Sequence, residues 1–217
     1  PVVLAGRGAI RAGAKEAAIA LADEVGALLA TTLPAKSWFD GHPWSVGICG
    51  GFATPLGADL IGDADVVVVL GAGVTFDLGD AHDDEGVDGA LDPRTVCAEL
   101  EHLLPANRQL ITDGGHFCGF PASYLSVPEP SAFLFSLDFG SVGLGLGSAI
   151  GAAVAHPERL TVLAIGDGGL MMSLGDLETL SREQVPMLVL VFDDGAYGAE
   201  LHFLRMLGLP EEESLFT

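Results

Sequence analysis

The sequence predicts an α/β protein with parallel, doubly wound sheets in two domains. Short apolar runs typical of buried parallel strands alternate with stretches of helical periodicity. Glycine is abundant, at 30 of 217 residues, which suits tight turns and close packing of helices on strands. The chain is also 49% hydrophobic, which is enough for one large or two small hydrophobic cores.

The amino-terminal part reads as a piece of a doubly wound sheet. Three apolar runs are expected to form strands, at residues 1–5, 28–32 and 64–69. We expect a turn at residues 6–8, then an Ala-rich helix over residues 12–25 that stops at Gly26. The third strand ends in the glycine turn of residues 71–73. This order of strand, helix and strand indicates parallel pairing.

An acidic, glycine-containing run follows, with few large apolar residues. Such a composition is typical of a linker or loop. We therefore divide the chain into a first domain at residues 1–77, an acidic linker or a hidden gap in the sequence at residues 78–91, and a second domain at residues 92–217.

The second domain repeats the alternation of helices and strands. Asp92 and Pro93 open a helix as its cap and its first residue, and that helix ends near Leu104. Two more helices are expected at residues 141–155 and 173–183. Strands are expected at residues 109–112, 160–165 and 186–192. Helical crossovers between these strands imply a second parallel sheet.

The charge and the cysteines exclude several classes of partner. Nine basic and 30 acidic residues give a formal net charge of −21, which would repel nucleic acid and anionic membranes. No apolar stretch is long enough to span a bilayer, and no secretory leader is visible. Three cysteines without close spacing argue against a disulfide framework or a structural zinc site. We therefore expect a cytoplasmic protein with reduced thiols and no nucleic-acid or membrane partner.

Two predicted strands of the second domain end in acidic turns, Gly166-Asp167-Gly168 and Asp193-Asp194-Gly195. Ligands of open parallel sheets bind at the carboxyl ends of strands, and one αβ unit separates Asp167 from Asp194. Two carboxylates and a turn carbonyl can bind Mg²⁺, which takes phosphate oxygens as further ligands. Each turn alone is also an ordinary end of a strand, but the two together indicate a site for Mg²⁺ and a diphosphate.

These two turns resemble the signature of thiamine-diphosphate-dependent enzymes, whose second turn is usually Asn-Asn. Residues 112–117, 139–153 and 157–200 resemble the superfamily of acetolactate synthase and benzoylformate decarboxylase. PVVLAGRGAIRAGA and ADVVVVLGAG are similar to that superfamily's central domain. The resemblance implies a partial central domain followed by a thiamine-diphosphate-binding domain that is incomplete at its carboxyl end.

The resemblance also implies a role for each matching residue. Asp167, Asp194 and the backbone carbonyl of Ala196 would bind Mg²⁺. The cofactor would be contacted by His116, Phe117, Gly140, Val142, Gly168, Gly169, Tyr197 and Gly198. The Gly140 carbonyl would accept a hydrogen bond from the cofactor's 4′-amino group, and Val142 would support its bent shape. His202 follows the cofactor loop closely enough to approach the site. An Asp at position 194 adds negative charge beside the metal, so a degenerate site is an alternative.

The resemblance implies a thiamine-diphosphate- and Mg²⁺-dependent 2-oxo acid carboligase or decarboxylase, similar to acetolactate synthase. The alternatives are a simple 2-oxo acid decarboxylase or oxidase, and a non-catalytic fragment or scaffold. The glutamate that activates the cofactor lies in the family's pyrimidine-binding domain, which this sequence does not contain. We therefore expect the isolated chain to be inactive, and the active site to form against the pyrimidine-binding domain of a second subunit in a homodimer or homotetramer.

FAD is the weaker of the cofactor expectations. Thr31-Thr32-Leu33 and the glycine turn of residues 71–73 lie where the resemblance would place it. Val74-Thr75-Phe76 stand in place of the arginine that usually follows.

Overall fold

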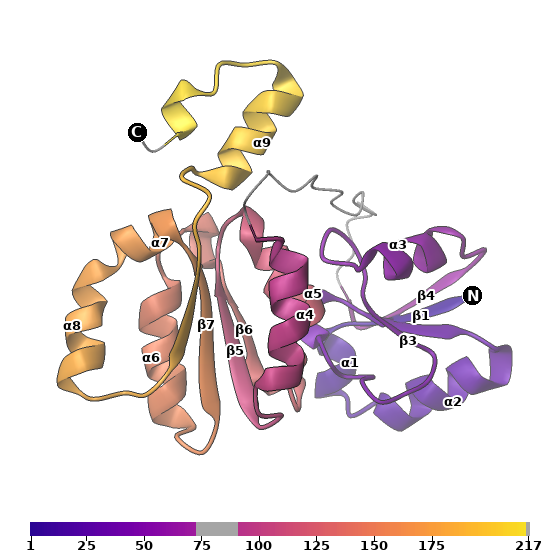
Figure 1. The fold of residues 1–217 in the computed structure, drawn as a ribbon. Helices are drawn as coiled ribbons and strands as arrows, with labels where there is room; N and C mark the ends of the chain where they lie inside the picture. Colours follow the sequence, from indigo (N-terminus) through magenta and orange to yellow (C-terminus); the bar gives the residue numbers. More distant parts are fainter. Residues whose placement is uncertain (73–90, 216–217) are drawn as a thin grey trace. The chain divides into compact units, whose positions relative to one another are not determined.

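The computed structural model describes residues 1–72 and 91–215 (Figure 1). The chain forms two compact units. Unit 1 comprises residues 1–101 and 122–133, and unit 2 comprises residues 102–121 and 134–217. The predicted linker, apart from Leu91, and the last residue of the glycine turn at 71–73 lie outside the described residues, so the predicted division at residues 78–91 stays a prediction.

Unit 1 contains a four-stranded sheet with the order β3-β2-β1-β4. Its strands are β1 (Val2–Ala5), β2 (Leu28–Thr31), β3 (Ser45–Ile48) and β4 (Val67–Leu70), and neighbouring strands pair in parallel. The expected strands at 1–5 and 28–32 are present. The expected strand at 64–69 begins three residues later, at Val67, and β3 was not predicted because its four residues include a glycine.

Helices cover both faces of this sheet (Figure 1). Alternate strand residues such as Val3 and Leu29 pack with Ala18 and Ala22 of α2 (Lys15–Val25). The intervening strand residues pack with Ile61 of α3 (Pro55–Gly62). This burial on alternate faces is what a doubly wound sheet requires.

The expected turn at residues 6–8 is wrong, because α1 (Arg7–Arg11) begins there. The helix expected over 12–25 therefore starts only at Lys15, after Gly13 at φ +62°. Its predicted end is confirmed, because Gly26 closes α2 in the left-handed conformation. Glycine adopts this conformation without a steric cost.

The carboxyl ends of β1 and β4 meet where the strand order reverses. The N–H groups of Gly6 and Gly8 donate to the carbonyls of Leu70 and Gly71 at 2.9 and 2.8 Å. Gly71 has a φ of +60°, and a Cβ there would collide with the backbone nitrogen of Ala9. Two stretches of backbone thus fill this crevice, and glycine is required for them to approach so closely.

Unit 2 contains a second four-stranded sheet with the order β6-β5-β7-β8. Its strands are β5 (Arg108–Asp113), β6 (Phe133–Ser136), β7 (Leu160–Gly166) and β8 (Leu188–Phe192). The β5–β7 and β7–β8 pairs are parallel. With two such parallel sheets and their helices, the predicted α/β fold class is confirmed.

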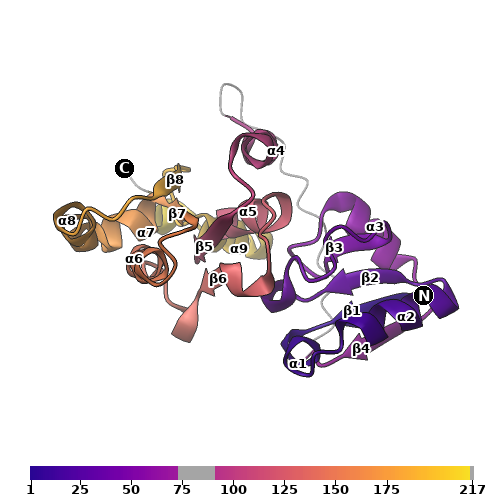
Figure 2. The same ribbon diagram turned by 90° about the horizontal axis from the view of Figure 1, so that it is seen from below.

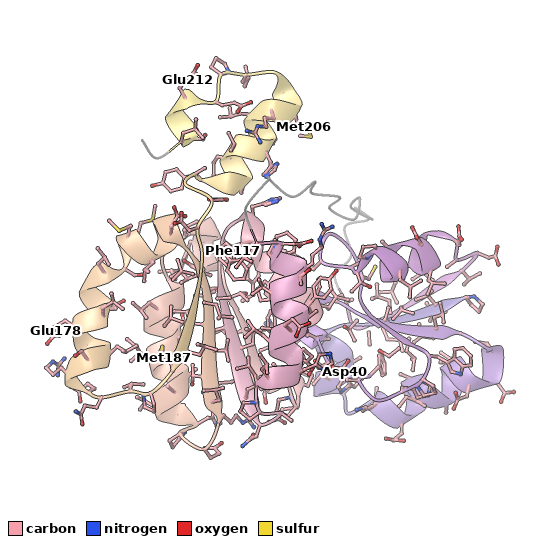
Figure 3. All side chains as sticks on the ribbon, in the orientation of Figure 1. Asp40, Phe117, Glu178, Met187, Met206 and Glu212 are labelled. Carbon is pink, nitrogen blue, oxygen red and sulfur yellow. The ribbon has the colours of Figure 1, made fainter. Side chains whose placement is uncertain are left out.

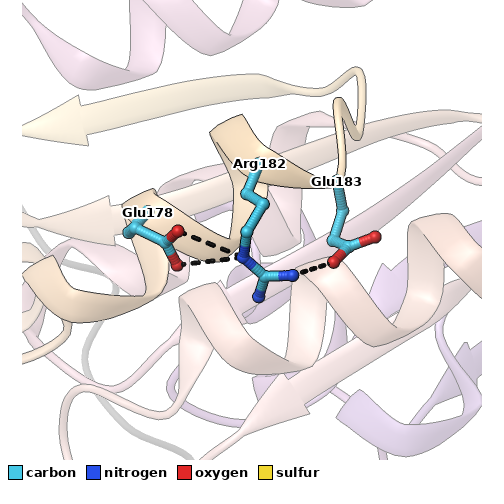
Figure 4. A network of polar contacts seen from close by, with 3 residues as sticks. All are labelled: Glu178, Arg182 and Glu183. Carbon is cyan, nitrogen blue, oxygen red and sulfur yellow. Dashed lines mark hydrogen bonds and ion pairs between the residues drawn. The ribbon is translucent and has the colours of Figure 1, made fainter.

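The helices that follow residue 91, in either unit, are α4 (Pro93–Leu103), α5 (Gly119–Tyr124), α6 (Gly145–Ala155), α7 (Asp167–Met172), α8 (Leu174–Arg182) and α9 (Gly198–Leu207). Seen from below, α6 lies along one face of the sheet (Figure 2). There Leu146 and Ala149 pack on Ile111, Leu163 and Ile165. On α8, the Arg182 side chain lies between Glu178 and Glu183 and bonds to both (Figure 4).

Two predicted helix starts in unit 2 are wrong. The helix expected from residue 141 begins at Gly145, because Gly143 has a φ of +89° that interrupts it. The helix expected from Ser173 corresponds to α8, but the separate helix α7 already begins at Asp167. The acidic turn after β7 is therefore the first turn of a helix. In the described part of the chain, no helix is long and apolar enough to cross a membrane.

Replacing Gly71 by Ala should destabilise unit 1, because the new methyl group meets the Ala9 backbone and the left-handed φ costs about 1–2 kcal/mol. Gly62→Ala is the matched control, because a Cβ there has no described atom within 4 Å. Its helical site should leave stability unchanged or raise it by up to about 1 kcal/mol. Urea unfolding followed by circular dichroism measures both. An equal midpoint for the two variants would contradict the close packing.

Candidate functional site

Unit 2 has its own switch point between β5 and β7, where the strand order reverses. Asp113 ends β5, Gly166 ends β7 and Phe192 ends β8. Because these strands run parallel, their carboxyl ends lie at one edge of the sheet. Ligands of open α/β sheets bind at this position.

Asp167 is the first residue of α7, directly after β7. Burial raises the pKa of its carboxyl group, and the nearby charges of Asp194 and Asp193 raise it further, while the N–H of Gly168 opposes the rise. The structure therefore brings the predicted pair Asp167 and Asp194 close together, and adds Asp193. Neighbouring carboxylates resist ionisation because each charge disfavours the next.

The turn after β8 holds its two acids in defined positions. Asp194 Oδ1 accepts a hydrogen bond from the Ala196 N–H at 3.2 Å, and Asp193 Oδ1 accepts one from Gly195 at 3.3 Å. Asp194 Oδ2 lies against Gly198, where a Cβ would collide with it. Gly198 opens α9, so a glycine is needed for this helix to start beside the carboxylate.

Ala196 and Tyr197 are tied to the carboxyl-terminal segment. Ala196 is buried and forms an isolated β-bridge with Leu215. The Tyr197 N–H donates to the Ser214 carbonyl at 2.8 Å, and its side chain is partly exposed. These contacts fix the backbone on which the predicted carbonyl ligand lies.

His116 and Phe117 lie on a short 3-10 turn that follows β5. The His116 ring stacks on that of His202 from α9, with centroids 4.0 Å apart and planes at 25°. Phe117 is buried (labelled in Figure 3). Its ring stacks on that of Phe192 with centroids 5.1 Å apart. The Phe117 ring thus presents an apolar surface next to the last residues of β7 and β8. The sequence placed His202 near the site only by its distance along the chain.

Gly140 and Val142 belong to the loop that precedes α6. Phe139 and Gly140 both have left-handed backbones, at φ +61° and +67°, and the Phe139 side chain is fully exposed. A Cβ on Gly169 would lie 3.3 Å from Val142 Cγ1. The loop therefore passes beside α7, and the structure brings Val142 to the buried pair Gly168 and Gly169.

Asp113 is a buried acid at the switch point that the sequence reasoning missed. Its Oδ2 accepts a hydrogen bond from the Gly143 N–H at 2.8 Å, and among the described residues its Oδ1 has no partner. Burial raises the pKa of this carboxyl group, although the N–H groups of Gly143 and Gly114 oppose the rise. Asp167 and Asp194 were predicted because they follow the carboxyl ends of parallel strands. Asp113 lies at the carboxyl end of β5, so the same argument could have identified it from the sequence.

The donors at this edge fit a divalent cation held by few side chains. In the described ranges no three His, Cys, Asp or Glu side chains form a metal-binding group. The predicted set needs only two carboxylates and a carbonyl, with the remaining ligands from phosphate and water, as Mg²⁺ prefers. A cation would also offset the repulsion that raises the pKa of Asp167.

The fold and the site define a two-unit α/β protein with a candidate ligand site at the switch point of its second sheet. Residues 113–209 match the model of the thiamine pyrophosphate enzyme carboxyl-terminal TPP-binding domain, and residues 1–85 match that of the central domain. The chain belongs to the thiamine pyrophosphate enzyme superfamily, as its resemblance predicted.

Curated relatives with different activities match about half of the chain. A sulfoacetaldehyde acetyltransferase of Alcaligenes xylosoxydans xylosoxydans is 37% identical over 110 residues, which are 51% of this chain and 18% of the relative. A 2-hydroxyacyl-CoA lyase 2 of Mus musculus is 37% identical over 108 residues, 49% and 17% of the two chains. An alpha-keto-acid decarboxylase of Mycobacterium bovis is 43% identical over 101 residues, 46% and 17%. The matched segments thus span under a fifth of each of these three relatives.

Replacing Asp167 by Asn should stabilise the protein without ligand at neutral pH. A carboxyl group with a raised folded-state pKa stabilises the fold while protonated, and this contribution is lost as the pH rises through that pKa. The gain from Asn should therefore be present at pH 7, stay below about 1 kcal/mol for a partly exposed group, and disappear in acid. Asp176→Asn is the control, because Asp176 lies in the first turn of α8, where loss of its charge should weaken the helix. Thermal unfolding between pH 3 and pH 8 measures both, and a stability loss for Asp167→Asn at pH 7 would contradict the repulsion.

Proposed function

We propose that this chain supplies the thiamine-diphosphate- and Mg²⁺-binding part of an enzyme that acts on 2-oxo acids, similar to acetolactate synthase. The observation that carries the proposal is the proximity of Asp167 and Asp194, which follow neighbouring parallel strands at the switch point. The family of the chain supports the cofactor, and the donor set supports the metal.

The proposed site residues bind either the metal or one part of the cofactor. Asp167 and Asp194 bind Mg²⁺ with the carbonyl of Ala196, and the metal links this acidic edge to the diphosphate. Gly168 and Gly169 allow the diphosphate to approach the backbone closely, beside Tyr197 and Gly198. The Gly140 carbonyl and the Val142 side chain orient the aminopyrimidine. When bound, thiamine diphosphate supplies the electron sink that cleavage next to a 2-oxo acid carbonyl requires.

His116 and Phe117 have different roles at the proposed site. Phe117 has no polar group to offer, and its stacking on Phe192 excludes water from beneath the metal site. His116 has two ring nitrogens and lies against Gly198, whose Cβ would be 3.2 Å from His116 Cβ. The imidazole is the group of this turn that contacts the diphosphate.

A simple 2-oxo acid decarboxylase is the second candidate, because an alpha-keto-acid decarboxylase shows 43% identity in the matched segment. The other two relatives carry the names of an acetyltransferase and a lyase, so the carboligase reaction rests on the resemblance to acetolactate synthase. In either case we propose that the aminopyrimidine end is completed by the pyrimidine-binding domain of a second subunit, in a cytoplasmic homodimer or homotetramer. The three unpaired cysteines agree with that location.

FAD remains a secondary proposal for unit 1. The amides of Gly6 and Gly8 at the start of α1 already bond to Leu70 and Gly71. A flavin dinucleotide would therefore need phosphate donors from elsewhere in that unit.

Titration of thiamine diphosphate into the intact protein should show binding that requires Mg²⁺. Asp167→Ala should abolish this binding, because alanine offers the metal no side-chain oxygen. Asp194→Asn should retain it, because an amide oxygen still ligates and a negative charge is removed. Asp176→Asn is the control and should bind as the wild type does. Calorimetry that finds no binding under any condition would favour the scaffold alternative.

Incubating the intact enzyme with pyruvate should distinguish the two reactions. Acetolactate is expected if the enzyme joins the acyl unit to a second carbonyl compound. Acetaldehyde would assign the simple decarboxylase, and acetate the oxidase. Chromatography of the products with and without Mg²⁺ measures the outcome, and the Asp167→Ala variant controls for other enzymes in the preparation.

A further inference from the structure

The segments of the proposed site converge on one buried side chain, Asp113. His116 and Phe117 follow it directly along the chain. On the loop before α6, Gly143 donates its N–H to Asp113 Oδ2 at 2.8 Å. On α7, the position that a Cβ of Gly169 would take collides with the same Oδ2. The carboxyl group thus contacts two of the three other segments that carry proposed cofactor residues; the segment of Tyr197 and Gly198 is not among them.

Two helices are shaped to admit this carboxyl group. A Cβ on Gly145, the first residue of α6, would lie 2.7 Å from Asp113 Cβ and 3.1 Å from its Cγ. Gly169 of α7 likewise lacks a side chain where Asp113 Oδ2 lies. Any larger residue at either glycine would push the helix or the acid aside. The glycines and the acid therefore form one packed unit.

Asp113 occupies this position although its burial is costly. Its side chain is fully buried, and within residues 1–72 and 91–215 its Oδ1 has no hydrogen-bond partner. A buried polar group without a partner destabilises the fold, whereas an apolar residue of similar shape would not. Such a cost is expected where a side chain has a task that an apolar residue cannot perform.

We propose that Asp113 is a positioning residue that holds the Gly140–Val142 loop in register with the diphosphate-binding turn of α7. The carboxylate accepts the Gly143 N–H, and this bond sets where the loop turns into α6. Alanine at this position would remove the acceptor, whereas asparagine would keep one side-chain oxygen for the Gly143 N–H. Asp113 does not touch the cofactor. The purpose of the positioning rests on the proposed function, but the positioning itself exists without a ligand.

Hydrogen exchange of the intact protein without cofactor tests the positioning directly. Asp113→Ala should speed exchange of the Gly143 amide roughly tenfold or more, because its acceptor is lost. Thr112→Val is the matched control on the same strand. The Thr112 hydroxyl is buried, and the described structure offers it no partner, so its loss should leave exchange at Gly143 unchanged. Unchanged exchange in a folded Asp113→Ala variant would overturn the proposal.

Cofactor affinity tests the purpose separately. Asp113→Ala should raise the Kd for thiamine diphosphate with Mg²⁺ about tenfold, while Thr112→Val leaves it unchanged. A lower melting temperature with unchanged affinity and unchanged Gly143 exchange would indicate a merely structural role and overturn the proposal. If the wild type binds no thiamine diphosphate, the proposed function fails, and the exchange experiment still decides the positioning.

A second variant covers the case in which Asp113→Ala does not fold. Gly169→Ala keeps Asp113 but pushes its Oδ2 away from α7, so Gly143 exchange should again rise severalfold. Gly151→Ala is its control, because a Cβ at that site on α6 meets no described atom within 4 Å. Equal Gly143 exchange in the two glycine variants would contradict the role of the carboxylate.

Discussion

Parallel pairing of β5, β7 and β8 is the constraint on which the site depends. It brings the carboxyl ends of three strands to one edge, so that residues far apart in sequence become neighbours there. It places the acids Asp113, Asp167 and Asp194 at this edge, and it allows Phe117 to stack on Phe192. Antiparallel pairing of β7 with β8 would have sent Asp167 and Asp194 to opposite ends of the sheet.

The sequence predicted the elements whose signals are local. Gly26 closes α2 and Asp167 follows β7 as expected, because glycine and strand-end acids act through their own backbone. It did not predict where α6 begins, because Gly143 is held by Asp113, thirty residues earlier in the chain. It could not pair His116 with His202 either, because ring stacking depends on how α9 packs.

The acidity of the chain has a physical meaning at the site. A net charge of −21 opposes the approach of a diphosphate, and the carboxylates at the switch point add to that opposition locally. A divalent ion reverses the sign of the interaction at this edge, since it is the largest local charge in such a site. Metal and cofactor are therefore expected to bind together, with little affinity for either alone.

The two sheets of this protein use the same topological feature in opposite ways. In unit 2 the acids Asp193 and Asp194 at this edge of the sheet are exposed, whereas in unit 1 the backbone around Gly6, Gly8 and Gly71 fills the corresponding crevice. The closely spaced glycines after β1 would attract a motif search for nucleotide-binding loops. Here the glycine spacing allows two stretches of backbone to approach closely. The N–H groups of such glycines can bind a ligand only if no backbone carbonyl already accepts them.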